Sequence, residues 1–182
     1  SEPVDEGRFR ISPDVDDPRL TAPVTGVDHE GNPADIRVPT ERPLTIFLNK
    51  QEIVTAMTIA DYPDYLAVGY LLNQRMLTPD DKITGIDYDE DIDTVVVRTD
   101  RETDFEEKMK KRTQTSGCAQ GTVFGDLMDH LDEVRLPDDA VVKTSWIYAL
   151  SRQINQQPSL YLTAGAIHGC VLCEEDRPVA YM

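Results

Sequence analysis

Residues 44–59 read LTIFLNKQEIVTAMTI, and this stretch decides the fold. From Leu44 to Leu48, leucine and isoleucine occupy every second position, which is the period of a strand with one face toward a core. The tight polar connection Asn49-Lys50-Gln51 leads into a run rich in β-branched residues at 53–59. The stretch therefore predicts a β-hairpin.

Two more hairpins are predicted on either side of this one. Val24–Val27 and Ile36–Val38 flank a Gly-Asn turn at residues 31–32, a turn signal between two short apolar runs. Farther along the chain, Ile83–Tyr88 and Thr94–Arg98 form a strand pair across an acidic turn. The first half of the chain is therefore expected to be mainly β.

Helices are expected later in the chain, mixed with further strands. Asp61 and Pro63 mark a helix start, and the apolar positions that follow to Leu72 cover most of the circumference, so we expect this helix to be sandwiched in the core. Helical spacing of apolar residues predicts two amphipathic helices, at 124–131 and 146–154. Strands are predicted at 159–162, 167–172 and 179–181. This order indicates an α/β (α+β) domain.

The N-terminal residues differ in composition from the rest of the chain. Seven of the 12 prolines fall at or before Pro43, and residues 1–22 carry many acids and few large apolar side chains. We interpret residues 1–22 as a flexible arm, followed by a folded domain over residues 23–182.

The charge of the chain excludes several classes of ligand. With 18 Lys and Arg against 34 Asp and Glu among 182 residues, the net charge is −16, which argues against nucleic acid and against an anionic membrane surface. No apolar run approaches the ~18 residues of a spanning helix. The N-terminus lacks the pattern of a secretory signal, and three cysteines do not form a disulfide framework, so a cytoplasmic protein with reduced thiols is expected.

The segment most indicative of chemistry is residues 112–122, RTQTSGCAQGT. Its Cys118 lies among Gly, Ser and Thr, before a predicted helix and directly after the cations Lys108, Lys110, Lys111 and Arg112. Cations and a helix N-terminus lower the pKa of a thiol, and the resulting thiolate is the nucleophilic form. Cys118 is therefore either a reactive thiol or a plain loop cysteine.

A second set of soft donors lies near the C-terminus. His168, Cys170 and Cys173 raise the possibility of a zinc site. Two observations argue against zinc: in a strand, residues 170 and 173 point to opposite faces, and the sequence lacks a second ligand cluster. We therefore expect buried strand cysteines and no metal. A nucleophile elbow and the glycine-rich phosphate motifs are also absent from the sequence.

Four stretches of the sequence carry a family resemblance: LNKQE at 48–52, YLAVGYLL at 65–72, the cysteine segment 112–121, and AGAIHG at 164–169. They resemble the FdhD-type accessory sulfurtransferases of formate dehydrogenase, and AGAIHG is similar to that family's Thr-Gly-Gly-x-His-Ala. The resemblance covers roughly residues 42–182. It implies a cytidine-deaminase-like fold, a mixed sheet with packed helices. It also implies an activity, the relay of sulfur from a cysteine desulfurase to the molybdenum cofactor (bis-molybdopterin guanine dinucleotide) of an apo-formate dehydrogenase.

The resemblance also implies roles for individual residues. Cys118 would carry the sulfur, and Ser116, Gly117, Gly165 and His168 would contact the cofactor. The family commonly has a second loop cysteine where this chain has Gly121, so a disulfide within the loop cannot form. The mechanism that the resemblance then implies is that of a single-cysteine persulfide carrier. Gly121 equally favours an alternative, a non-catalytic module that binds the cofactor or the apo-dehydrogenase. A deaminase-type zinc hydrolase is disfavoured, because its His-x-Glu and Pro-Cys-x-x-Cys motifs are missing.

The resemblance finally implies a domain that is incomplete at its C-terminus. The chain stops at Met182, where the family continues with a further half-domain, so residues 23–182 correspond to the N-terminal part of an FdhD-like domain. An uncovered sheet edge and apolar helix face associate readily. We therefore expect a homo-oligomer, or association with a chain that carries the missing half.

Overall fold

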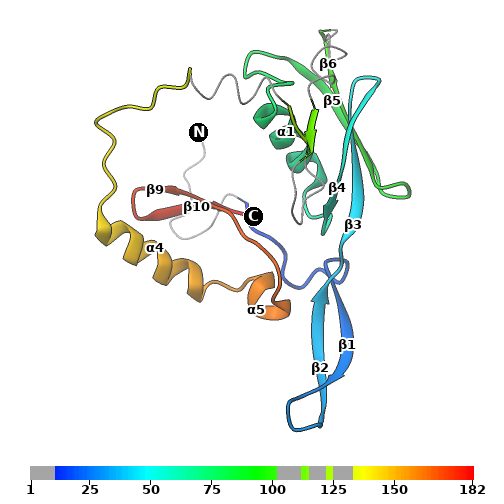
Figure 1. Cartoon of the computed structure of the whole chain (residues 1–182), viewed down its shortest axis with the longest axis vertical. Coiled ribbons are helices and arrows are strands. Elements are labelled where there is room, and N and C mark those ends of the chain that lie inside the picture. The colour runs from blue at the N-terminus through cyan, green and yellow to red at the C-terminus, as the bar shows by residue number, and fades with distance from the viewer. Residues whose placement is uncertain (1–10, 102–111, 115–121, 125–132) are drawn as a thin grey trace. The chain divides into compact units, whose positions relative to one another are not determined.

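The computed structural model describes residues 11–101, 112–114, 122–124 and 133–182 (Figure 1). The chain divides into two units, residues 41–135 and residues 1–40 together with 136–182. The elements follow in the order β1 (Thr21–Val27), β2 (Pro33–Pro39), β3 (Arg42–Leu48), β4 (Gln51–Thr58), α1 (Pro63–Asn73), β5 (Ile83–Asp89), β6 (Thr94–Thr99), β7 (Arg112–Gln114), β8 (Thr122–Phe124), α4 (Thr144–Gln156), α5 (Leu160–Ala164), β9 (Val171–Glu174) and β10 (Arg177–Tyr181).

The unit formed by residues 41–135 is built on a four-stranded sheet in the order β4-β3-β6-β5. Both hairpins predicted here are confirmed, because β3 pairs antiparallel with β4 and β5 pairs antiparallel with β6. The hairpins join through a parallel pairing of β3 with β6, in which Thr45 lies opposite Thr94 and Leu48 opposite Val97. The sheet is therefore mixed.

The alternation in β3 fixes which face of this sheet is buried. Leu44, Ile46 and Leu48 have no exposed surface, and Val95 and Val97 of β6 lie beside them in the same core. Burying one aliphatic side chain of this size contributes roughly 1.5–3 kcal/mol relative to leaving it exposed. The predicted period of two is thus confirmed, and its three apolar side chains belong to this core together with residues of β4, β6 and α1.

Helix α1 begins at Pro63 as predicted, but its expected burial on all sides is wrong. Ala67 and Leu71 are fully buried in the core, whereas Tyr65 is 51% exposed and Leu72 is 40% exposed. The apolar residues around α1 carry almost no directional signal, so the sequence could not show which side of the helix contacts the sheet. Among the described residues only one side of α1 is packed.

Strands β7 and β8 come directly before and after residues 115–121 in the sequence. They pair antiparallel, with Arg112 opposite Phe124 and Gln114 opposite Thr122, so residues 115–121 connect two paired strands. Phe124, expected as the first residue of an amphipathic helix, therefore ends a strand, since its backbone pairs with that of Arg112. The rest of that expected helix, 125–131, lies outside the described residues.

The other unit begins with the predicted hairpin of β1 and β2. These strands pair antiparallel with Val24 opposite Ile36, and the turn between them contains Gly31 at φ 85°, a conformation that glycine adopts without strain. The carboxylate of Asp28 accepts the backbone N–H groups of Glu30 and Asn32 at 2.9 Å each. Those hydrogen bonds, the one from Asn32 first, lower the pKa of Asp28.

The C-terminal segment contains one confirmed helix and two corrections. Helix α4 includes the predicted residues 146–154. The strand predicted at 159–162 is wrong, because Leu160–Ala164 is helical and Ser159 caps it by accepting the N–H of Leu162. The strand predicted at 167–172 begins only at Val171, whereas the strand at 179–181 lies within β10 and is confirmed.

The late start of β9 has a backbone cause. Gly165 and Ala166 both adopt positive φ angles, 62° and 50°, directly after α5, so the chain turns before it becomes extended. Strands β9 and β10 then pair antiparallel across a tight turn. The α+β class predicted from the sequence is confirmed. The cytidine-deaminase-like detail stays a prediction.

The predicted arm over residues 1–22 also stays a prediction. Residues 1–10 lie outside the described part, while Leu20 and Thr21 are buried and β1 begins at Thr21. None of the helices in the described ranges is long and apolar enough to cross a lipid bilayer.

Candidate functional site

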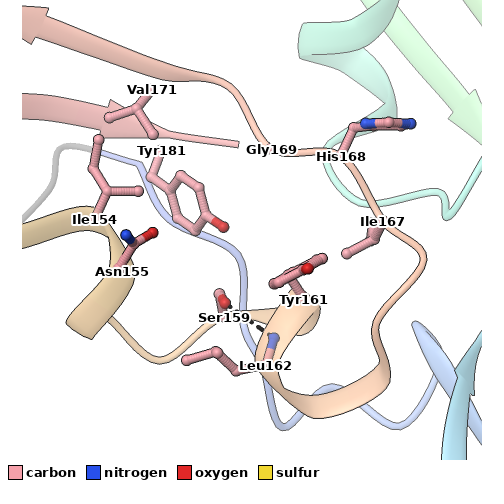
Figure 2. Close-up of a pocket in the computed structure, with 10 residues that line it drawn as sticks. All are labelled: Ile154, Asn155, Ser159, Tyr161, Leu162, Ile167, His168, Gly169, Val171 and Tyr181. Carbon is pink, nitrogen blue, oxygen red and sulfur yellow. Dashed lines mark hydrogen bonds between the residues drawn. The ribbon is translucent and has the colours of Figure 1, made fainter. Parts of the chain in front are cut away.

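A pocket of about 460 Å³ lies in the unit formed by residues 1–40 and 136–182 (Figure 2). Helix α4, helix α5, strands β9 and β10 and the segment before β9 surround it. The described residues that line it are Ile154, Asn155, Ser159, Tyr161, Leu162, Ile167, His168, Gly169, Val171 and Tyr181. Small-molecule sites commonly have volumes of roughly 300–1,000 Å³, so this pocket is of a size for a ligand or part of one.

The cap and turn of α5 position one side of the pocket. Ser159 is only 7% exposed, and its Oγ accepts the N–H of Leu162 at 3.3 Å while its carbonyl oxygen accepts the Thr163 hydroxyl. These bonds fix the first turn of α5, from which Tyr161 and Leu162 reach the pocket. At the other end of α5, Gly165 donates its N–H to Tyr161 at 2.8 Å. The short helix is therefore held at both ends.

Tyr181 forms the opposite side of the pocket. In β10 its backbone lies opposite Val171 of β9, and its N–H donates to the carbonyl oxygen of Ile11 at 2.9 Å. The next residue, Met182, exchanges two backbone hydrogen bonds with Cys170, of 2.6 and 2.9 Å. The strand is consequently fixed on both of its edges at the point where the Tyr181 ring enters the pocket (Figure 2).

The lining of the pocket is aromatic and without formal charge. None of its ten described residues is Asp, Glu, Lys or Arg, while Tyr161, His168 and Tyr181 contribute rings and Asn155 contributes a side-chain amide. Such a surface suits an uncharged planar group that stacks on rings and exchanges hydrogen bonds with amide and hydroxyl groups. A phosphate or another anion would find no cationic side chain among these residues.

The predicted site residues are only partly brought together. His168 lines the pocket, and Figure 2 shows it at the rim, on the side away from Ile154 and Asn155. Gly165 is near in sequence but ends α5 rather than lining the pocket. Ser116, Gly117 and Cys118 lie outside the described residues, as do Lys108, Lys110 and Lys111. Their predicted roles stay predictions.

The two C-terminal cysteines differ from expectation. Cys170 is exposed and precedes β9, so the prediction of a buried strand cysteine is wrong for this residue, because the chain has only just left the turn at Gly165 and Ala166. Cys173 is half-buried within β9 and contacts the carbonyl oxygen of Val171 through Sγ at 3.7 Å. In the part of the chain with described coordinates, no three His, Cys, Asp or Glu side chains gather to hold a metal ion.

Sequence reasoning missed most of this pocket. The sequence pattern predicts a strand at Ser159 and Tyr161, and it indicates no functional role for Asn155 or Tyr181. One local signal was present, because Pro158-Ser159 before an apolar run is a common helix start. No local signal gives Tyr181 a place in a pocket, since that place depends on its pairing with Ile11 and Val171, which are distant in sequence.

Comparison with known proteins gives one family and one fold. A model of the FdhD/NarQ family matches residues 39–182. "Sulfur carrier protein FdhD" of Listeria monocytogenes (serovar 1/2a, strain EGD-e) is 27% identical over 139 residues, which are 75% of this chain and 53% of the relative. The protein of the same name from Bacillus subtilis (strain 168) is 24% identical over 142 residues, 78% of this chain and 54% of the relative. The chain therefore spans about half the length of the curated relatives that it matches.

A solved structure supports the fold. The crystal structure of a protein described as a formate dehydrogenase accessory protein, from Desulfotalea psychrophila, aligns with a TM-score of 0.60. The alignment covers 89% of this chain and 60% of the other, at 18% sequence identity. At that identity the similarity establishes the fold alone.

Proposed function

Because this chain belongs to the FdhD/NarQ family, we propose that it is a sulfurtransferase that supports the maturation of a formate dehydrogenase. The observation that supports this most is the family match over residues 39–182, since the matched range includes both the cysteine segment and the pocket. The matched relatives are sulfur carrier proteins, and the sequence of this chain supplies one cysteine in a Gly/Ser-rich segment beside cations.

In the first half-reaction Cys118 takes sulfur from a cysteine desulfurase. The Cys118 thiolate attacks the terminal sulfur of the donor's persulfide, the sulfur–sulfur bond of the donor breaks, and the donor cysteine leaves as a thiolate. Cys118 then carries the persulfide. The cations Lys110, Lys111 and Arg112 favour the thiolate form that begins this step.

In the second half-reaction the terminal sulfur passes to the acceptor, which we propose to be the molybdenum cofactor, bis-molybdopterin guanine dinucleotide. The persulfide sulfur–sulfur bond breaks and its electron pair stays on Cys118, which is released as a thiolate, while the outer sulfur is transferred as a formally neutral atom and the acceptor supplies the electron pair of the new bond. With Gly121 in place of a second loop cysteine, no disulfide can form within the loop to compete with this transfer.

The pocket is proposed to hold an uncharged ring of this acceptor. Its volume of about 460 Å³ and its rings and amide suit one planar heterocycle, but not a whole dinucleotide with its phosphates. His168 at the rim would contact the same molecule, while Gly165 would act through the turn that it makes before His168. Ser116 and Gly117 are proposed to contact the acceptor from beside Cys118.

The proposed partners follow from the two half-reactions. A cysteine desulfurase donates, and an apo-formate dehydrogenase receives the sulfurated cofactor, both in the cytoplasm. Self-association or association with another chain, expected from the sequence, is a separate proposal that light scattering tests.

The decisive experiment is intact-mass analysis after incubation with a cysteine desulfurase and cysteine. We expect the added mass of one sulfur atom, which disappears on treatment with a reductant and is lost in Cys118→Ala. Cys170→Ala is the matched control, because Cys170 is the exposed cysteine among the described residues. Sulfur that persists in Cys118→Ala but disappears in Cys170→Ala would refute Cys118 as the carrier.

Gly121 and the charge-free pocket also support a second candidate, a non-catalytic module that binds the cofactor or the apo-dehydrogenase. The same experiment separates the two. A binding module gains no reductant-sensitive mass at any cysteine, yet still binds the acceptor.

A further inference from the structure

The ring of Tyr181 lies where a side chain of residue 169 would otherwise be. A Cβ atom placed on Gly169 would stand 3.0 Å from Cε2 and 3.1 Å from the hydroxyl oxygen of Tyr181. Both distances are shorter than ordinary van der Waals contact, so a Cβ atom at position 169 would require the Tyr181 ring to shift by a few tenths of an ångström. Both residues line the pocket (Figure 2). The absence of a side chain at Gly169 therefore leaves room for the ring in this position.

The backbone of Tyr181 cannot shift easily to relieve such a contact. It pairs with Val171 on one edge of β10 and donates to Ile11 on the other at 2.9 Å. Displacement must instead come from rotation of the Tyr181 side chain, which moves the ring and its hydroxyl within the pocket. Figure 2 shows that this hydroxyl points toward the space between Ser159 and Tyr161.

The position of the Tyr181 ring affects which ligands the pocket can bind. Tyr161 and Tyr181 lie on different elements of the pocket, and no formally charged acid or base is among its ten described residues. Discrimination among ligands must therefore come from shape, stacking and neutral hydrogen bonds, and the position of Tyr181 affects all three.

We propose that Tyr181, seated over Gly169, is the specificity-determining residue of the pocket, and that it selects an uncharged planar ring of the acceptor. The assignment rests on the proposed function only for the identity of the ligand. Gly169 acts through Tyr181 and is a positioning residue.

Binding of guanosine, the neutral nucleoside of the proposed acceptor, tests this assignment in the full chain by calorimetry. Gly169→Ala is expected to weaken binding about tenfold, the change that corresponds to ~1.4 kcal/mol. Tyr181→Phe removes only the hydroxyl and should weaken binding by about two- to tenfold, as expected for one neutral hydrogen bond. Gly26→Ala is the matched control, because its added Cβ meets nothing within 4 Å, and it should bind as the wild type does.

A second variant keeps the proposal testable if Gly169→Ala does not fold. Tyr181→Ala opens the pocket, so the affinity for bulkier 8-bromoguanosine relative to guanosine should rise by about tenfold or more. Failure of the wild type to bind guanosine, unchanged affinity in a folded Gly169→Ala, or an unchanged ratio in Tyr181→Ala would each overturn the proposal. Sulfur loading of Cys118, measured by mass in the same variants, reports separately on the proposed function.

Discussion

The side-chain carbonyl oxygen of Asn49 accepts the backbone N–H of Thr99 at 2.9 Å, which ties the turn after β3 to the end of β6. The Asn49 amide also donates to the Thr99 hydroxyl at 3.1 Å, and the Asn49 backbone N–H donates to Val97 at 2.8 Å. Asn49 lies 50 residues from Thr99 in sequence and adopts a left-handed φ of 54°. One residue thus closes the β3–β4 turn and anchors a neighbouring strand.

Asn49→Ala should lower the free energy of unfolding by about 1–3 kcal/mol, because it leaves the Thr99 N–H without its acceptor and places alanine at positive φ. Asn49→Gly should cost less, since glycine tolerates that backbone conformation. Urea denaturation measures both. Lys50→Ala, at the exposed neighbouring position, is the control, and an equal loss in Lys50→Ala would contradict the proposed anchor.

Neighbouring leucines in α1 give a second prediction. Leu71→Ala removes a fully buried side chain from the core and should cost about 2–5 kcal/mol of stability. Leu72→Ala makes the same substitution at a side chain that is 40% exposed and should cost about 1 kcal/mol or less. Equal losses in denaturation experiments would show that the exposed side of α1 is covered in solution.

The hairpins, α4 and the start of α1 could be predicted because each depends on local pattern. The period of two in residues 44–48 and the proline at position 63 required no knowledge of distant contacts. The strand predicted at Ser159–Leu162 is wrong because the local pattern is ambiguous there. Four residues with apolar side chains at alternate positions fit a short helix as well as a strand. The hydrogen bond by which Ser159 caps α5 favours the helix.

Apart from His168, the residues of the pocket could not be predicted from the sequence. Tyr181 meets Ile11, Gly169 and Val171 only after the chain has folded, and the contact with Gly169 depends on a missing side chain rather than on a recognisable motif. Cys118 is the opposite case: its sequence neighbours alone predict a reactive thiol, whereas the residue lies outside the described part of the structure.

Asp81 provides a prediction about pH. Its carboxylate accepts the Thr78 backbone N–H at 2.7 Å and pairs with Arg101 at 2.7 Å, and the Thr78 hydrogen bond, aided by Arg101, lowers the pKa of Asp81. A lowered folded-state pKa stabilises the fold above the unfolded-state value of about 3.9, and this stabilisation is lost as pH falls through the folded-state pKa.

Asp81→Asn should therefore be less stable than the wild type at pH 7, and the difference should narrow below about pH 4. Urea denaturation across this range measures the effect. Asp80→Asn, at the exposed neighbouring position, is the control and should follow the wild type more closely. A difference between Asp81→Asn and wild type that does not change with pH would contradict the role of the ionised carboxylate.

The last prediction concerns the relative reactivity of the three thiols. Cys118 should be alkylated fastest by iodoacetamide at neutral pH, because it alone lies in a Gly/Ser-rich segment directly after a group of cations that favour its thiolate. Cys170 should follow, since its side chain is exposed, and half-buried Cys173 should be slowest. Peptide mapping by mass spectrometry after short labelling times gives the three rates.

Two variants identify the cause of the difference. Replacing Lys110, Lys111 and Arg112 together with glutamine should slow the labelling of Cys118 while leaving Cys170 unchanged, because only the thiolate fraction of Cys118 depends on those charges. Cys118→Ala should leave the melting temperature nearly unchanged, as expected for a cysteine in a Gly/Ser-rich segment. Faster labelling of Cys170 than of Cys118 in the folded wild type would show that accessibility, not charge, controls thiol reactivity in this chain. That result would contradict the assignment of Cys118 as the sulfur-carrying residue.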